Sequence, residues 1–249
     1  MNWSKYSSPQ AFYPLAGRLI PWFAIVAVAL MGVGLYMGFF VAPTDFQQGE
    51  SYRIIFVHVP AAWMSMFLYV VMAIWAGVGM GLNARLSFMM AQAIAPTGAM
   101  FTFLALLTGA MWGKPTWGAW WVWDARLTSE LILLFQYAGV MLLRTSIDDM
   151  RRADRSSAVF ALVGVVNVPI IYFSVQWWNT LHQGASVSMS TGSKMAATML
   201  VAMLIMTVAF WLYSIAVVLA RVRCIVVERD SLPVWDEKPA VSQEVAEVR

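Results

Sequence analysis

Long apolar runs separated by short polar connections make up most of this chain. A helix needs about 20 apolar residues to cross the roughly 30 Å hydrocarbon core of a bilayer. Runs near this length predict six membrane-spanning helices: Leu19–Phe40, Val59–Gly81, Phe88–Met111, Leu127–Leu143, Ala158–Val175 and Ala196–Ala220. The first run is longer than a signal-peptide core, so we interpret it as a retained span. The expected fold class is an all-α integral membrane protein, a bundle of six transmembrane helices.

Composition agrees with a membrane protein and excludes several other classes. The chain is 61% hydrophobic and 12% charged, whereas soluble domains carry about 25% charged residues. The single cysteine, Cys224, cannot form an internal disulfide or a cysteine-based metal site. The apolar runs imply the lipid bilayer as a partner. In the mixed-charge segment Asp148–Arg155 acidic residues offset the basic ones, so we expect no nucleic acid as a partner. We assign residues 1–225 to one membrane domain and residues 226–249 to a disordered cytoplasmic tail, because the tail lacks apolar periodicity.

Lysine and arginine in the connections predict the orientation, because cytoplasmic loops carry an excess of these residues. One side of the predicted bundle holds twelve: Lys5, Arg18, Arg85, Arg144, Arg151, Arg152, Arg155, Arg221, Arg223, Arg229, Lys238 and Arg249. The other side holds four: Arg53, Lys114, Arg126 and Lys194. We therefore expect both termini in the cytoplasm. The loop between the third and fourth spans then faces the periplasm.

That loop contains the most unusual stretch of the sequence, Trp112–Arg126, with five of the thirteen tryptophans. We expect a loop or a helix that lies flat on the membrane surface. If Pro115 begins such a helix, four residues share one face: Trp117, Trp120, Trp121 and Asp124. Lys114 and Arg126 flank this face, so it would suit a large planar anionic ligand. The alternative is a belt of interfacial tryptophans that only anchors the protein.

The chain has two histidines, and the predicted topology places both on the outer side. His58 lies just ahead of Pro60, which fits the first turn of a helix. His182 lies in the third outer loop. Neutral imidazole is a common ligand of haem iron. One imidazole from each side would complete six-coordination, with the haem ring packed on the tryptophans.

Haem propionates need cationic partners, and Arg126, Arg53 and Lys114 are the candidates. Asp124 directly precedes the fourth span. This carboxylate would repel the propionates, so we expect it to orient Arg126 or to cap the next helix.

The pattern Trp-Gly-x-x-x-Trp-Gly-x-Trp-Trp-x-Trp-Asp-x-Arg, here Trp112 through Arg126, resembles the "WWD" motif of haem-handling membrane proteins that serve cytochrome c biogenesis. Within that family, six spans and two outward histidines resemble cytochrome c maturation protein C, also called haem exporter protein C. The resemblance covers roughly residues 10–225. It implies that haem b is held at the outer face of the cytoplasmic (inner) membrane by the motif, including Trp123, with His58 and His182 as axial ligands.

The same resemblance implies transfer of this haem to a membrane-anchored periplasmic haem chaperone. A small single-span partner and the ATPase and permease subunits of an ABC transporter would assist its release.

We expect a haem-handling protein rather than an enzyme. The sequence has no ATP-hydrolysing motif of its own, because Gly109 to Lys114 is one residue short of a phosphate loop and Pro115 replaces the required Ser or Thr.

Two other functions compete with haem transfer. A haem-b electron carrier or quinone-linked oxidoreductase would also use two histidines, but its ligands usually lie inside the bundle core. A transport permease would enclose a path marked by polar residues within the spans, and the candidates are Glu130 and Asn167.

Two further local expectations follow from the sequence. Asn167 and Pro169 should bend the fifth span. The mixed-charge segment Asp148–Arg155 should form a solvated connector.

Overall fold

The computed structural model describes residues 7–182, 187–188, 192–193 and 195–231. These residues form seven α-helices: α1 (Pro9–Tyr36), α2 (Ile55–Leu82), α3 (Arg85–Trp117), α4 (Ala125–Thr145), α5 (Met150–Gly164), α6 (Asn167–Trp177) and α7 (Ala197–Ser231). A π-helical turn, η2 (Met37–Val41), extends α1, and a 3₁₀ turn, η3 (Glu50–Ile54), precedes α2. The two-residue strands β1 (Val187–Ser188) and β2 (Gly192–Ser193) pair antiparallel.

Six helical segments within the described ranges are long and apolar enough to cross a membrane. α5 and α6 together form the fifth of them. The predicted all-α fold and its six spans are therefore confirmed.

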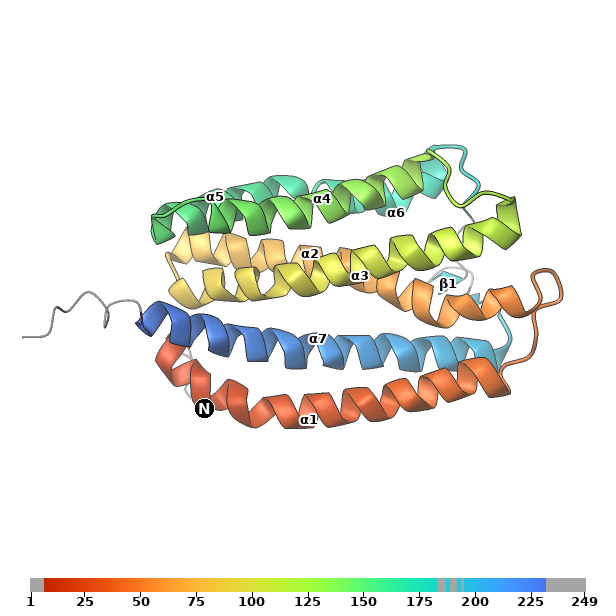
Figure 1. Cartoon of the computed structure of the whole chain (residues 1–249), viewed down its shortest axis with the longest axis horizontal. Helices are drawn as coiled ribbons and strands as arrows, with labels where there is room; N and C mark the ends of the chain where they lie inside the picture. The colour runs from red at the N-terminus through yellow and green to blue at the C-terminus, as the bar shows by residue number, and fades with distance from the viewer. Residues whose placement is uncertain (1–6, 183–186, 189–191, 194, 232–249) are drawn as a thin grey trace, which may run out of the picture.

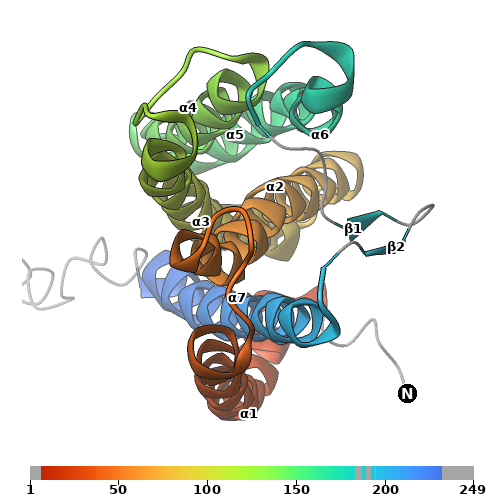
Figure 2. The same ribbon diagram turned by 90° about the vertical axis from the view of Figure 1, so that its right-hand side faces the viewer.

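The helices lie roughly parallel to the long axis of the molecule (Figure 1). α1 packs against α7, α2 packs against α3, and α4 packs against α5 and α6. Seen along the bundle, the α2–α3 pair lies between the α1–α7 pair and the group of α4, α5 and α6 (Figure 2). The start of α1 and the end of α7 lie at one end of the bundle. The loops after η2, α3 and α6 lie at the other end, which we call the loop end.

Short polar side chains and left-handed residues set several helix boundaries. Asp124 caps α4 by accepting the Leu127 N–H at 2.8 Å, and Asp149 caps α5 by accepting the Arg152 N–H at 2.7 Å. Asn83 ends α2 with φ of 49°, a conformation that asparagine tolerates better than most residues. The predicted capping role of Asp124 is thus confirmed.

The fifth span is interrupted where the sequence predicts a bend. α5 ends at Gly164, and α6 begins at Asn167. The Asn167 side chain donates to the Ser129 carbonyl of α4 at 2.9 Å. Pro169 falls in the first turn of α6, where its missing N–H removes no helical hydrogen bond.

Some predicted span boundaries differ from the structure. α2 begins at Ile55 rather than near Val59, so Pro60 lies inside the helix and not in its first turn. The reason is that η3 continues directly into α2. α7 continues to Ser231, past the predicted end of the sixth span at Ala220. Most of the predicted tail, residues 232–249, lies outside the described residues.

The prediction of a solvated connector over Asp148–Arg155 is wrong. α5 begins at Met150, and its Asp154 side chain is buried against α7. Arg229 of α7 binds both Asp154 oxygens, at 2.8 and 2.9 Å. Charged residues alternate in this segment, and the sequence pattern did not reveal that one of them points inward.

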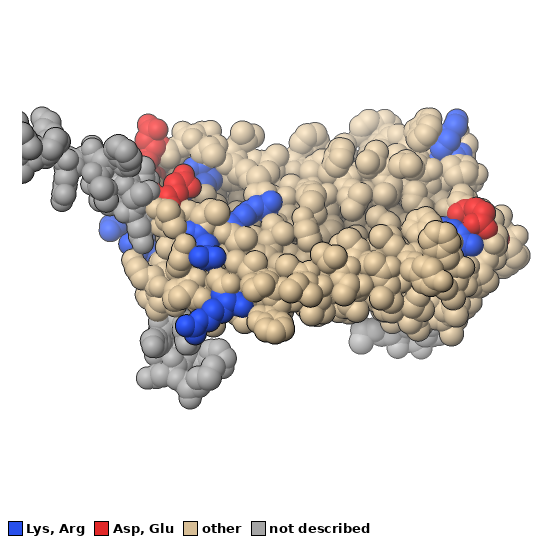
Figure 3. Space-filling model, turned by 60° about the horizontal axis from the view of Figure 1, so that its bottom comes forward, with Lys and Arg blue, Asp and Glu red and all other residues tan. Residues whose placement is uncertain are grey.

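The described lysines and arginines divide unequally between the two ends. The end opposite the loop end carries nine: Arg18, Arg85, Arg144, Arg151, Arg152, Arg155, Arg221, Arg223 and Arg229. The loop end carries Arg53, Lys114 and Arg126. On the face shown in Figure 3, basic side chains likewise gather toward one end. Lys5, Lys194, Lys238 and Arg249 lie outside the described residues.

Candidate functional site

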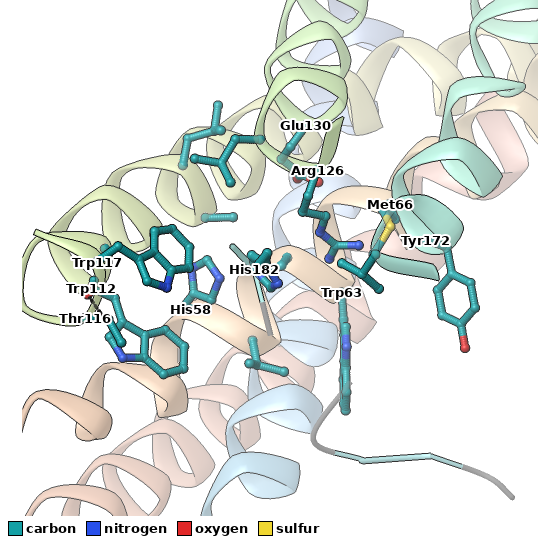
Figure 4. Close-up of a pocket in the computed structure, with 18 of the residues that line it drawn as sticks. His58, Trp63, Met66, Trp112, Thr116, Trp117, Arg126, Glu130, Tyr172 and His182 are labelled. Carbon is teal, nitrogen blue, oxygen red and sulfur yellow. Dashed lines mark hydrogen bonds between the residues drawn. The ribbon is translucent and has the colours of Figure 1, made fainter. Parts of the chain in front are cut away.

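A cavity of about 260 Å³ opens at the loop end of the bundle. Helices α2, α3, α4, α6 and α7 form its walls, together with the loop that follows α6. Its lining includes both histidines, aromatic side chains and one cation: His58, His182, Trp63, Trp112, Trp117, Tyr172 and Arg126 (Figure 4). These residues come from segments far apart in the sequence, so only the tertiary fold brings them together.

The two histidines lie close together in this cavity, as predicted from the sequence. Their ring centroids are 6.3 Å apart, and their planes are inclined by 36°. His58 is held in the first turn of α2 and is only 9% exposed. His182 lies in the loop after α6, where its backbone N–H donates to Thr180 Oγ1 at 3.0 Å. One imidazole is therefore fixed by a helix, and the other is carried by a loop.

A threonine on α3 fixes the orientation of the His58 ring. His58 Nδ1 lies 3.0 Å from Thr108 Oγ1. The Thr108 hydroxyl has one proton, and its shortest hydrogen bond runs to the Leu104 carbonyl at 2.6 Å. Thr108 Oγ1 must then accept from His58 Nδ1–H, which assigns the proton to Nδ1. His58 Nε2 is left with a lone pair that can bind a metal.

Two tryptophans of the Trp112–Arg126 stretch line the cavity beside the histidines. The Trp112 ring meets the His58 ring edge-on at 5.6 Å, and the Trp117 ring lies 6.2 Å from the His182 ring. Trp112 Nε1 also donates to Gln48 Oε1 at 2.7 Å, which ties this side chain to the loop between η2 and η3. Each imidazole thus has an indole neighbour.

The predicted surface helix after Pro115 is absent, so the loop alternative is correct. Pro115 lies in the last turn of α3, which ends at Trp117. Gly118 terminates the helix with φ of 78°, and its N–H donates to the Lys114 carbonyl at 3.1 Å. Residues 118–124 are not helical. The continuous face predicted for Trp117, Trp120, Trp121 and Asp124 was therefore wrong.

The other tryptophans of the stretch lie outside the cavity lining. Trp120 and Trp123 are 59% and 77% exposed. Trp121 is partly buried and meets the Trp123 ring edge-on at 5.4 Å. Asp124 is occupied by the α4 cap through one oxygen. The stretch therefore divides into two cavity-lining indoles on α3 and a more exposed aromatic loop.

The three predicted cations have different surroundings. Arg126 lines the cavity and donates to the Ile171 carbonyl of α6 at 2.7 Å. Arg53 pairs with Glu50 and donates to the Gly38 and Ala42 carbonyls, so it holds η3 against η2 and the residue that follows it. Lys114 is exposed and donates to the Gly118 carbonyl. Arg126 is the one of the three that the fold brings to the cavity.

Sequence reasoning missed several residues of the cavity. Thr108 carried no motif that would single it out. Ala62 and Met66 lie four and eight positions after His58, so helical periodicity could have placed them on its face. Glu130, considered above as a mark of a transport path, lines the cavity and accepts from Ser65 Oγ of α2 at 2.6 Å.

Comparison with known proteins identifies the family. The model of the family described as "Heme exporter protein C" matches residues 2–237. The chain belongs to the haem exporter protein C family. The sequence-based recognition is therefore confirmed.

Individual relatives agree with this assignment. Heme exporter protein C of Escherichia coli (strain K12) is 54% identical over 178 residues, 72% of this chain and 73% of that protein. The protein of the same description from Haemophilus influenzae is 44% identical over 230 residues, 92% of this chain and 94% of the relative. A ccmC-like mitochondrial protein of Marchantia polymorpha, described as one of cytochrome c biosynthesis, is 44% identical over 182 residues, 73% of this chain and 77% of the relative.

Proposed function

We propose that this chain holds haem b at the loop end of its bundle and passes it to a periplasmic haem chaperone during cytochrome c maturation. The descriptions of the family and of its relatives name haem export and cytochrome c biosynthesis. The cavity supplies the chemistry for such a cargo: two imidazoles for iron, two indoles for the ring and a guanidinium for a propionate.

The distance between the two histidines is the observation that carries this proposal. A metal bound to one nitrogen of each imidazole, at about 2 Å from each, places the two ring centroids roughly 6 Å apart when they lie on opposite sides. The observed separation is 6.3 Å. The separation of the two rings thus matches the spacing that one iron bound by both would require.

The volume of the cavity supports a haem that is only partly enclosed and stays accessible to a second protein. Pockets that bury a drug-sized ligand have volumes of about 300–1,000 Å³, and this cavity has about 260 Å³. A macrocycle bound between the histidines would exceed this volume, so one edge of it would remain outside the cavity. A second protein could reach that edge and replace one axial ligand, and the loop-borne His182 is the one we expect to leave.

The same proposal includes the orientation and the partners. The excess of described cations at the end opposite the loop end supports both termini in the cytoplasm and the cavity at the periplasmic side of the inner membrane. Besides the chaperone, we propose a small single-span subunit and the ATPase and permease subunits of an ABC transporter as partners in release.

A transfer assay tests the proposal directly. The haem-loaded protein in detergent is mixed with the purified apo form of the chaperone, the two are separated, and haem absorption is measured in each fraction. We expect haem to move to the chaperone and to leave this chain. Haem that stays bound here, together with reproducible quinone-linked electron transfer, would instead establish the electron-carrier alternative.

Replacing Thr108 with Val is expected to weaken haem binding without unfolding the protein. The substitution keeps the shape but removes the acceptor that fixes His58 Nδ1–H, and loss of such an outer-shell partner lowers metal affinity by about 10- to 100-fold. Haem titration followed by absorption spectroscopy measures the change.

Two matched variants separate this effect from general damage to α3. Thr108→Ser retains the hydroxyl and should restore binding. Thr102→Val removes a buried hydroxyl of α3 that donates to the Gly98 carbonyl, and it should leave haem affinity unchanged. Equal affinity in Thr108→Val and the unmodified protein would show that Thr108 does not position His58.

A further inference from the structure

A second cavity, of about 320 Å³, lies near the end of the bundle opposite the loop end. Helices α2, α3, α4, α5 and α7 enclose it, and none of its lining residues belongs to the histidine cavity. Its walls are largely apolar, with Met72 of α2, Phe88 of α3 and Ile225 of α7 among them. Nothing in the proposed haem transfer requires a cavity here.

Arg221 of α7 brings a positive charge to this apolar cavity without a carboxylate partner. Its Nη1 donates to Thr97 Oγ1 at 2.6 Å and to the Ala93 carbonyl at 3.4 Å, and both acceptors are neutral. Within the described part of the chain, no carboxylate lies within ion-pair distance of Arg221. The guanidinium is held in place by these bonds, but its charge is not neutralised by them.

The remaining charges around the cavity leave a positive excess. Arg144 of α4 lies 3.4 Å from Asp154 Oδ1 and donates to Gln92 Oε1 at 3.3 Å. Asp154 is also bound through both oxygens to Arg229. The exposed Glu228 of α7 acts electrostatically on Arg144 as well. Arg144 and Arg229 thus share Asp154, with Glu228 acting on Arg144 in addition, whereas the hydrogen-bond partners of Arg221 are neutral.

We propose that this cavity binds an acidic phospholipid, with its phosphate on Arg221 and Arg144 and the start of an acyl chain among the apolar walls. A guanidinium among apolar side chains is costly unless it is paired with an anion, and its planar fork suits phosphate oxygens. Basic pockets between transmembrane helices are suited to acidic lipid headgroups. A zwitterionic headgroup fits less well, because it brings its own cation next to two guanidiniums.

The position of the cavity gives such a lipid a route of entry. Thr145 at the end of α4 and Cys224 on α7 both line the cavity, and both are exposed. They therefore mark its mouth. Cys224 is the only cysteine of the sequence, so a thiol-reactive fluorophore reports from this mouth alone.

Quenching by brominated lipids tests the proposal on the full chain. The protein is labelled at Cys224 with bimane and reconstituted into phosphatidylcholine vesicles that contain either brominated phosphatidylglycerol or brominated phosphatidylcholine at the same fraction. We expect stronger quenching by the acidic lipid. Arg221→Gln should lower the apparent affinity for the acidic lipid by about fivefold, the effect of one basic residue near a charged membrane surface.

Two controls distinguish a site from a general effect of charge. Arg152→Gln removes an exposed positive charge at the start of α5, outside the cavity lining, and should leave the preference unchanged. Ala158→Leu narrows the cavity without a change of charge and should also reduce quenching by the acidic lipid.

The other outcomes would overturn the proposal. Equal quenching by the two lipids would show that the cavity has no acidic-lipid site. An equal loss of affinity for the acidic lipid in Arg221→Gln and Arg152→Gln would show the same. Displacement of the brominated acidic lipid by added haemin but not by unbrominated phosphatidylglycerol would assign the cavity to haem carboxylates instead.

Discussion

Haem bound to the His58→Ala or His182→Ala variant is expected to lose its six-coordinate, low-spin spectrum and to dissociate more readily. These are the only histidines of the sequence, and both line one cavity with ring centroids 6.3 Å apart. Removal of one imidazole leaves iron with a single axial ligand from this chain. Since loss of an outer-shell partner alone lowers metal affinity by about 10- to 100-fold, we expect a loss of more than about tenfold. Absorption spectra of the purified variants and the rate of haem loss to an apo-globin measure both effects.

The double variant and free imidazole serve as controls. His58→Ala/His182→Ala leaves no imidazole in the chain, so any remaining bis-histidine spectrum would have to come from another protein. Added imidazole should restore the low-spin spectrum of each single variant, because it supplies the missing ligand. Wild-type spectra and transfer in both single variants would exclude His58 and His182 as the axial ligands.

Asp154→Asn is expected to cause the largest loss of stability at the opposite end of the bundle. Asp154 is buried and accepts hydrogen bonds from both Nη1 and Nη2 of Arg229, whose side chain is 4% exposed. Removal of one partner from a buried ion pair costs about 3–5 kcal/mol, because the other charge remains buried. The free energy of unfolding in detergent, measured by thermal or SDS-induced unfolding, should fall accordingly.

Two further variants test the cause of this loss. Asp148→Asn changes an exposed carboxylate that lies before α5 and should have little effect. Asp154→Leu/Arg229→Met removes both charges and should recover much of the stability, because well-packed apolar residues can replace a buried pair. If Asp154→Asn unfolded like the unmodified protein, the ion pair between α5 and α7 would not contribute to stability.

Local chemistry explains the predictions that succeeded. The spans follow from the length of the apolar runs, the α4 cap from a carboxylate directly before a helix, and the break in the fifth span from Asn167 and Pro169. Each of these features depends on residues within a few positions of one another. One wrong prediction also has a local cause. The left-handed conformation of Gly118 ends α3, so the helix that would have placed the tryptophans on one face does not form.

The sequence by itself determined the class of fold, the number of spans and the two residue types able to bind haem iron and pack on its ring. Only the tertiary structure decided that His58 meets His182, that Thr108 orients His58, and that Trp112 and Trp117 line the cavity. It also decided that Asp154 is buried on Arg229. The physical reason is that helix propensity and hydrophobicity act between neighbours in the chain, whereas these contacts join different helices and depend on the rotation and depth of each helix in the packed bundle.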